Sequence, residues 1–178
     1  MTAADPLTPT PDEKDWTWVL ERACPDCGFD PGAIANADLA PAIRQATLPW
    51  PAVLARPTMR ERPAPEVWSP LEYGCHVRDV CRLFTLRTRL ILDEDDPLFA
   101  NWDQDATALE SRYWAQDPAV VAAELAEGAA ELVETYAAVP GDAWQRPGRR
   151  SNGSVFTTET LGRYLLHDLV HHLWDVRA

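Results

Sequence analysis

Three histidines near the C-terminus have the residue type and the spacing to bind a metal ion. His167, His171 and His172 lie in the segment Thr157–Arg177, which we predict to be a helix of about five turns. No proline interrupts this segment, and no glycine follows Gly162 in it. At about 100° per residue, His167 and His171 lie one above the other on one face, the i, i+4 spacing at which a helix offers two imidazole nitrogens to one ion. His172 is turned about 100° from His171, so we expect it not to bind the same ion directly.

A third ligand can come from His76, the one other histidine in the chain. It lies at the edge of the apolar stripe of another predicted helix, and helical bundles bind metals through inward-facing side chains of different helices. His76 could thus join His167 and His171 in holding one divalent metal ion; the alternative is that these histidines are polar surface or hydrogen-bonded core residues. Glu72 and Asp79, four residues before His76 and three after it, lie near its face and could orient its second nitrogen or join the ligands.

A CxxC motif, Cys24-Pro-Asp-Cys27, is a second set of residues that could bind a metal. It supplies two ligands where a structural zinc ion needs four, and Cys75 and Cys81 cannot jointly complete the set because six positions on a helix place them about 120° apart. A thioredoxin-like motif would need an α/β pattern around it, and none follows. We favour a reduced, structural pair in a tight turn, with redox activity and metal binding as the alternatives.

Long amphipathic segments, joined by short links, must position these residues. We predict helices over four ranges: 36–56, 70–92, 118–138 and 157–177. The second has a clear start, with Ser69 as N-cap, Pro70 at the first helical position and Glu72 three residues after the cap. The pattern indicates an all-α fold, a four-helix bundle over residues 36–178 that follows an N-terminal extension over residues 1–35.

The extension and the connections have weaker patterns. Residues 1–15 are polar and rich in proline, which predicts a disordered lead-in, and Trp16–Leu20 resembles a short strand. A short helix is expected over residues 106–116. The basic turn Trp144–Ser154 could form a hairpin. Its arginines could bind an anionic group, and these are Arg146, Arg149 and Arg150. The alternative is that the turn is simply exposed, as basic turns more often are.

The connection Asp93–Asp105 is acidic and has aromatic residues embedded in it. One interpretation is a solvated link between helices. The other is a lid over a pocket, in which Trp102, Asp103 and Gln104 face a bound ligand. Tyr164, on the last predicted helix, could line the same pocket.

The charge and the apolar segments limit the partners. The net charge of -12 would repel phosphate backbones and anionic lipid, so we expect no nucleic-acid and no membrane partner. No apolar run approaches the roughly 20 residues that cross a bilayer, and the N-terminus lacks the features of a signal peptide. We therefore expect a cytoplasmic protein whose four cysteines are mostly reduced.

Two of these segments together resemble a known family. Trp68-Ser-Pro-Leu-Glu-Tyr-Gly-Cys-His76 and His167-Asp-Leu-Val-His-His172 are similar to the DinB-like superfamily, which includes the DinB/YfiT-like proteins, the mycothiol-dependent maleylpyruvate isomerases and the bacillithiol and mycothiol S-transferases. The resemblance covers about residues 36–176, and the stretch Asp96–Asp105 looks like an actinobacterial branch. It implies a four-helix bundle that holds one divalent metal ion, often zinc or nickel, through His76, His167 and His171.

Three protein ligands leave an open position on the ion, as in catalytic rather than structural sites. The leading hypothesis is a thiol S-transferase or isomerase that uses mycothiol, with a small-molecule thiol and an electrophile as its partners. A second is a metal-dependent hydrolase, with Glu72 or Asp79 as the base. A third is a metal-binding or stress-related bundle protein without catalysis, a homodimer through an apolar helix face.

Overall fold

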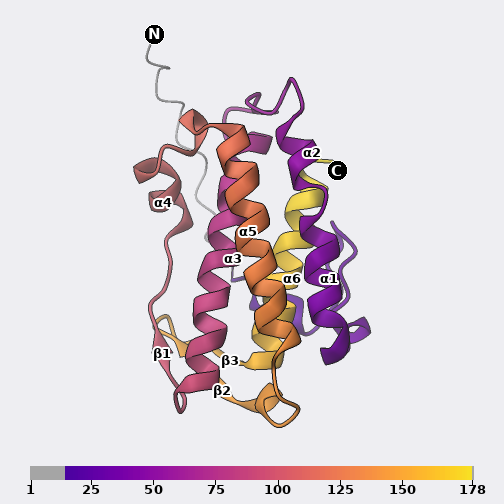
Figure 1. The fold of residues 1–178 in the computed structure, drawn as a ribbon, viewed down its shortest axis with the longest axis vertical. Helices are drawn as coiled ribbons and strands as arrows, with labels where there is room; N and C mark the ends of the chain where they lie inside the picture. The colour runs from indigo at the N-terminus through magenta and orange to yellow at the C-terminus, as the bar shows by residue number, and fades with distance from the viewer. Residues whose placement is uncertain (1–14, 178) are drawn as a thin grey trace.

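The long helices pack side by side as a four-helix bundle in the computed structural model, which describes residues 15–177 (Figure 1). Its members are α3 (Pro70–Asp93), α5 (Pro118–Ala137), α6 (Thr158–Asp175) and the consecutive pair α1 (Leu39–Thr47) and α2 (Trp50–Leu54). Pro49 and Pro51 flank Trp50 at the start of α2, and the helix predicted over residues 36–56 is divided there into α1 and α2. The predicted disordered lead-in lies outside the described residues apart from Asp15.

Side-chain caps fix where the long helices begin. The Ser69 hydroxyl accepts a hydrogen bond from the backbone of Glu72, whose carboxylate accepts one from the backbone of Ser69, which is the predicted capping box at the start of α3. Asp117 caps α5, and Thr157 pairs with Thr160 at the start of α6. The helices therefore begin where the local sequence satisfies their first amide groups.

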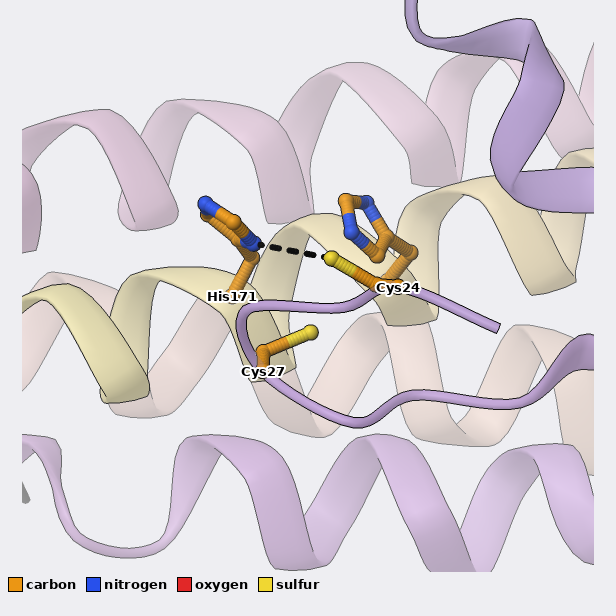
Figure 2. A group of neighbouring side chains, drawn as sticks. Cys24, Cys27 and His171 are labelled. Atoms are coloured by element: carbon orange, nitrogen blue, oxygen red, sulfur yellow. Dashed lines mark hydrogen bonds between the residues drawn. The ribbon is translucent and has the colours of Figure 1, made fainter. Parts of the chain in front are cut away.

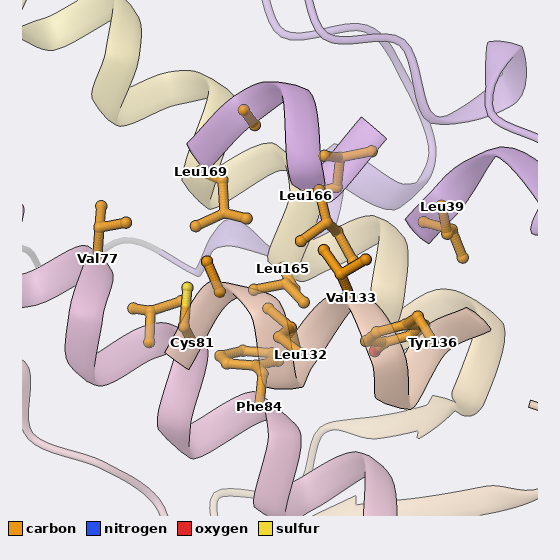
Figure 3. Packing of buried hydrophobic residues seen from close by; sticks show 14 of the residues in the cluster. Leu39, Val77, Cys81, Phe84, Leu132, Val133, Tyr136, Leu165, Leu166 and Leu169 are labelled. Atoms are coloured by element: carbon orange, nitrogen blue, oxygen red, sulfur yellow. The ribbon is translucent and has the colours of Figure 1, made fainter. Parts of the chain in front are cut away.

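The core lies where α3, α5 and α6 meet (Figure 3). Phe84 of α3, Leu132 of α5 and Leu165 of α6 are all buried in it. Gly162 lets α6 approach α5 closely, because a Cβ atom at this position would lie 2.7 Å from the ring of Tyr136. This packing sets how α6 is rotated about its own axis.

The all-α prediction is only partly correct, because the described residues also form a three-stranded sheet. β1 (Leu98–Phe99) pairs in parallel with β2 (Pro147–Arg150), which pairs antiparallel with β3 (Val155–Thr157). β2 and β3 form the hairpin that the basic turn suggested. β1 is too short to show an alternating pattern, so its pairing is a long-range feature that joins the acidic connection to the start of α6.

The described part of the N-terminal extension, from Asp15 onward, is folded, and part of it differs from the prediction. Trp16–Leu20 is a 3₁₀ helix rather than a strand, because the Asp15 carboxylate accepts a hydrogen bond from the amide of Thr17 and closes a helical turn. Short 3₁₀ turns follow at Pro31–Ala33 and Asn36–Asp38.

The remaining short elements lie in the connections. The helix expected over residues 106–116 is α4 (Gln104–Glu110) followed by a 3₁₀ turn (Tyr113–Ala115), separated at Arg112, where φ is 49°. A last 3₁₀ turn covers Ala143–Gln145. By length and hydropathy, the helices between residues 15 and 177 include no candidate for a membrane-spanning segment.

Candidate metal centre

The histidines predicted to share one ion are divided between two groups of potential ligands. In each group the ligand atoms all lie within 4.8 Å of one another: His76, Asp168 and His172 in one, and Cys24, Cys27, His167 and His171 in the other. No such group within residues 15–177 joins His76 to His167 and His171. His172, expected to lie apart from the metal, faces His76 instead.

The rotation of α6 explains this difference from the predicted set. The helix carries two overlapping i, i+4 pairs, His167/His171 and Asp168/His172. At 100° per residue, Asp168 and His172 lie within about 60° of Leu165, whereas His167 and His171 lie more than about 100° from it. Because Leu165 is fully buried in the bundle, the pair that shares its face is the pair turned toward α3 and His76.

The first group is closely packed. His76 Nε2 lies 3.6 Å from Asp168 Oδ2, and the other oxygen of Asp168 lies 3.5 Å from His172 Nε2. His172 Nδ1 lies 2.8 Å from Asp175 Oδ2, so that Nδ1 can donate its proton there and leave Nε2 as an acceptor facing the group. Trp102 stacks on His76 with ring centroids 5.3 Å apart and an interplanar angle of 12°.

Buried atoms without partners indicate that a cation fits this group. His76 is only 1% exposed, yet among the described residues neither of its ring nitrogens has a hydrogen-bond partner, and the same holds for Asp168 Oδ2. Leaving such atoms unsatisfied is costly, and a metal ion would satisfy them. Two imidazoles and a carboxylate are also a ligand set of catalytic zinc sites.

The protonation states suit the same role. Burial lowers the pKa of His76, which keeps its imidazole neutral and able to bind a metal. Burial would also lower the pKa of His172, but Asp168 and Asp175 outweigh it and raise the pKa to about 10. Burial opposes ionisation of Asp168, yet His172 and His76 lower its pKa overall. Without a metal, His172 is therefore protonated at neutral pH and pairs with Asp168 and Asp175. A divalent cation that bound His172 Nε2 would displace the proton from that atom.

This group lies at the wall of a pocket of about 800 Å³. Asp168 and His172 line the pocket, and so do the four residues predicted to face a ligand: Trp102, Asp103, Gln104 and Tyr164. The Asp103 carboxylate also caps α4 by accepting a hydrogen bond from Ala106. Of the three arginines in the basic turn, Arg150 alone is part of the described pocket wall.

Glu72 and Asp79 do not face this pocket. Arg62 and Ser69 both donate hydrogen bonds to the Glu72 carboxylate, and although burial opposes it, these bonds lower the pKa of Glu72. Asp79 accepts hydrogen bonds from Arg78 and from the Tyr113 hydroxyl. The Glu72 carboxylate thus pairs with Arg62 and the Asp79 carboxylate with Arg78. Neither carboxylate is one of the potential metal ligands in the group of His76, Asp168 and His172.

Comparison with known proteins agrees with this architecture. The sequence profile of the DinB superfamily matches residues 42–176, well over half of the chain. The chain belongs to the DinB superfamily. Its fold is similar to that of YfiT from Bacillus subtilis, described as a probable metal-dependent hydrolase with an unusual four-helix bundle topology. The TM-score is 0.66 at 19% sequence identity, over 81% of this chain and 88% of YfiT, so this likeness bears on the fold alone. A search against curated protein sequences returned no match.

Three residues at this candidate site were not expected there from the sequence: Asp168, His172 and Asp175. Asp168 and His172 have the same i, i+4 spacing as the predicted pair, and a carboxylate is an ordinary metal ligand. A search for His or Asp at this spacing would have found both pairs. Only the packing of α6 against α3 and α5 decides which pair meets His76.

Proposed function

We propose that this DinB-superfamily protein is a divalent-metal-dependent enzyme that binds its ion through His76, Asp168 and His172 and acts on small molecules in the adjoining pocket. The observation that carries the proposal is the buried, unpartnered nitrogens of His76 and oxygen of Asp168, in a group whose Asp168 and His172 line the pocket. Zinc and nickel are the favoured ions, because imidazole suits both.

The reaction we favour is transfer of a low-molecular-weight thiol, with mycothiol as the cosubstrate, to an electrophile. A bound divalent cation would lower the pKa of the thiol, so that the sulfur becomes a nucleophile near neutral pH. His76, Asp168 and His172 would hold the ion, and three protein ligands would leave room for a thiol on it, while Asp175 orients His172.

The other pocket residues position the two substrates. Trp102 stacks on His76 and keeps water from that side of the group. Arg150 donates hydrogen bonds to Asn152 and Ser154, and its guanidinium lies 5.8 Å from the ring centroid of Tyr164. Held in this way at the pocket wall, Arg150 offers a positive charge to a carboxylate of the thiol or of the electrophile.

Hydrolysis is the second candidate, and the description of YfiT favours it. It would need a base or a metal-activated water molecule in the pocket. The bases expected from the sequence, Glu72 and Asp79, are held in ion pairs with Arg62 and Arg78, so hydrolysis would depend on water activated by the metal alone. Thiol transfer needs no such base, and we rank it first for that reason. A metal-binding bundle without catalysis is the third hypothesis.

Metal analysis and a paired activity screen test the proposal. The protein, loaded with zinc or nickel, is incubated with electrophiles with and without thiol, and with simple esters and amides. Thiol-dependent product formation that is lost in the His76→Ala variant supports transfer, and turnover without thiol supports hydrolysis. Undiminished turnover by the metal-free protein would refute both, and no turnover of any substrate would favour the non-catalytic bundle.

A further inference from the structure

The second group of ligands joins the N-terminal segment to the last helix. Cys24 and Cys27 lie in the loop that follows the first 3₁₀ helix, and His167 and His171 lie on α6. Figure 2 shows the Cys24 sulfur pointing at His171, with Cys27 across the turn. Both cysteines precede residue 42, where the DinB-superfamily match begins, so two of the four ligands lie outside the region shared with the family, whereas His167 and His171 lie within it.

The spacing between these atoms suits a tetrahedral zinc ion. Cys24 Sγ lies 3.7 Å from His171 Nδ1. With a zinc–sulfur bond of about 2.3 Å, a zinc–nitrogen bond of about 2.05 Å and a tetrahedral angle between them, two such ligands are about 3.6 Å apart. All four ligand atoms fall within 4.8 Å of one another, so a single ion can reach each of them after small side-chain adjustments.

The loop has the backbone of a turn that presents two thiolates to one point. The Gly28 amide donates to the Cys24 carbonyl at 3.0 Å, and the Cys24 amide donates to the Phe29 carbonyl at 2.8 Å. Gly28 has φ of 75°, a conformation that other residues rarely adopt. The turn is thus closed by its own hydrogen bonds, with both cysteines on the side that faces α6.

The two histidines are packed against an aromatic ring, and one of them also lies near a carboxylate. His171 Nε2, the nitrogen turned away from Cys24, lies 3.9 Å from the carboxylate of Asp175. The centroid of the Trp16 ring lies 5.5 Å from the ring centroid of His167 and 5.3 Å from the ring centroid of His171. His167 is 4% exposed, and its Nε2 has no hydrogen-bond partner within the described part of the chain.

We propose that Cys24, Cys27, His167 and His171 bind a second metal ion, a structural zinc that fastens the N-terminal segment to α6. On binding, the two thiols release their protons to solvent and become thiolates, while the imidazoles stay neutral. Two thiolates balance the charge of Zn²⁺, so the site buries no net charge. Four protein ligands also leave no open position, which distinguishes this site from the one at His76.

This zinc would support the pocket as well as the N-terminal segment. Trp16, His167 and His171 line the pocket together with Asp168 and His172 of the other group. Because the two groups alternate along α6, fixing His167 and His171 on one side also fixes the direction in which their neighbours point. The site would therefore help to position the proposed active centre, although its own ion, with four protein ligands, would leave no position for a substrate.

Cobalt substitution of the full-length protein tests the proposal without relying on a variant. Cobalt bound by cysteine thiolates gives an intense sulfur-to-metal charge-transfer band, which a site of imidazoles and carboxylate cannot give. We expect this band in the wild type, its loss in the Cys24→Ser/Cys27→Ser variant, and its retention in the His76→Ala variant. Elemental analysis should find one zinc fewer per chain in each variant than in the wild type.

Thiol alkylation provides a second measurement on the wild type. Zinc should protect Cys24 and Cys27 from iodoacetamide and a chelator should expose them, whereas buried Cys75 and Cys81 should stay protected in both conditions. A wild type without the charge-transfer band, equal alkylation with and without zinc, or a disulfide between the two cysteines in protein handled under reducing conditions would overturn the proposal. A band that persists while the His76 group binds no metal would refute the proposed function and leave this zinc site standing.

Discussion

Replacing Asp175 by asparagine should weaken metal binding at the two groups to different extents. The Asp175 carboxylate lies between them, with one oxygen 2.8 Å from His172 Nδ1 and the other 3.9 Å from His171 Nε2. Asparagine keeps the shape of the side chain and an acceptor oxygen but removes the charge. The variant thus tests how much the charged hydrogen bond contributes at each site.

The distances set the expected magnitudes. At His172 the variant replaces a charge-assisted hydrogen bond by a neutral one, and losing such an outer partner typically costs about 10–100-fold in metal affinity. This corresponds to roughly 1.4–2.7 kcal/mol. At His171 the gap is longer than a hydrogen bond, so the loss should stay below about 1 kcal/mol, or roughly fivefold.

Competition with a chelator measures both affinities. The cobalt charge-transfer band reports the cysteine-containing site, and the remaining metal reports the His76 site. Glu159→Gln is the matched control, because it removes the same charge from α6 at a carboxylate that pairs with Arg163 instead. Equal losses of affinity at the two sites, or a loss as large in the control, would refute the argument from distance.

Three further predictions concern stability and are measured by urea unfolding in the presence of a chelator. Glu72→Gln should destabilise the chain by about 2 kcal/mol at neutral pH, because Arg62 loses a charged partner. The pKa of Glu72 lies below its ordinary value of 4.5, so the stabilisation by the ionised carboxylate is complete above pH 4.5. It is lost as the pH falls through the folded-state pKa. A difference in unfolding free energy between wild type and variant that persists in acid would contradict the prediction. Leu165→Ala should cost about 3 kcal/mol, since the side chain is fully buried, and a cost near zero would mean that the core is elsewhere. Tyr136→Phe should cost about 1–3 kcal/mol, because Thr88 loses the buried acceptor of its hydroxyl, and unchanged stability would show that the bond contributes nothing.

Local signals explain why much of the bundle could be predicted from the sequence. Ser69, Pro70 and Glu72 mark the first turn of α3 through hydrogen bonds between residues three apart, and the structure has those bonds. The strand expected at Trp16–Leu20 was wrong because the Asp15 cap closes a 3₁₀ turn over a sequence that also suits a strand. β1 has two residues and depends on partners about 50 positions away in β2, so no local pattern could reveal it.

The metal-binding residues were harder to group because their grouping depends on packing. Helical spacing places His167 with His171 and, equally well, Asp168 with His172. The choice between these pairs for His76 follows from the rotation of α6, which large buried residues on other helices determine. The partners of Cys24 lie more than 140 positions further along the chain, so the CxxC motif alone could not show what completes it.

The interleaving of the two groups on α6 has a consequence for the history of the family. Relatives that lose Cys24 or Cys27 lose the reason to keep His167 and His171, whereas the constraint on His76, Asp168 and His172 stays. We therefore expect the two cysteines and their two histidine partners to appear and disappear together among homologues. Their presence should be independent of that of His76, Asp168 and His172. Neighbouring positions of one helix would then follow separate evolutionary paths, with Asp175 retained wherever His172 remains.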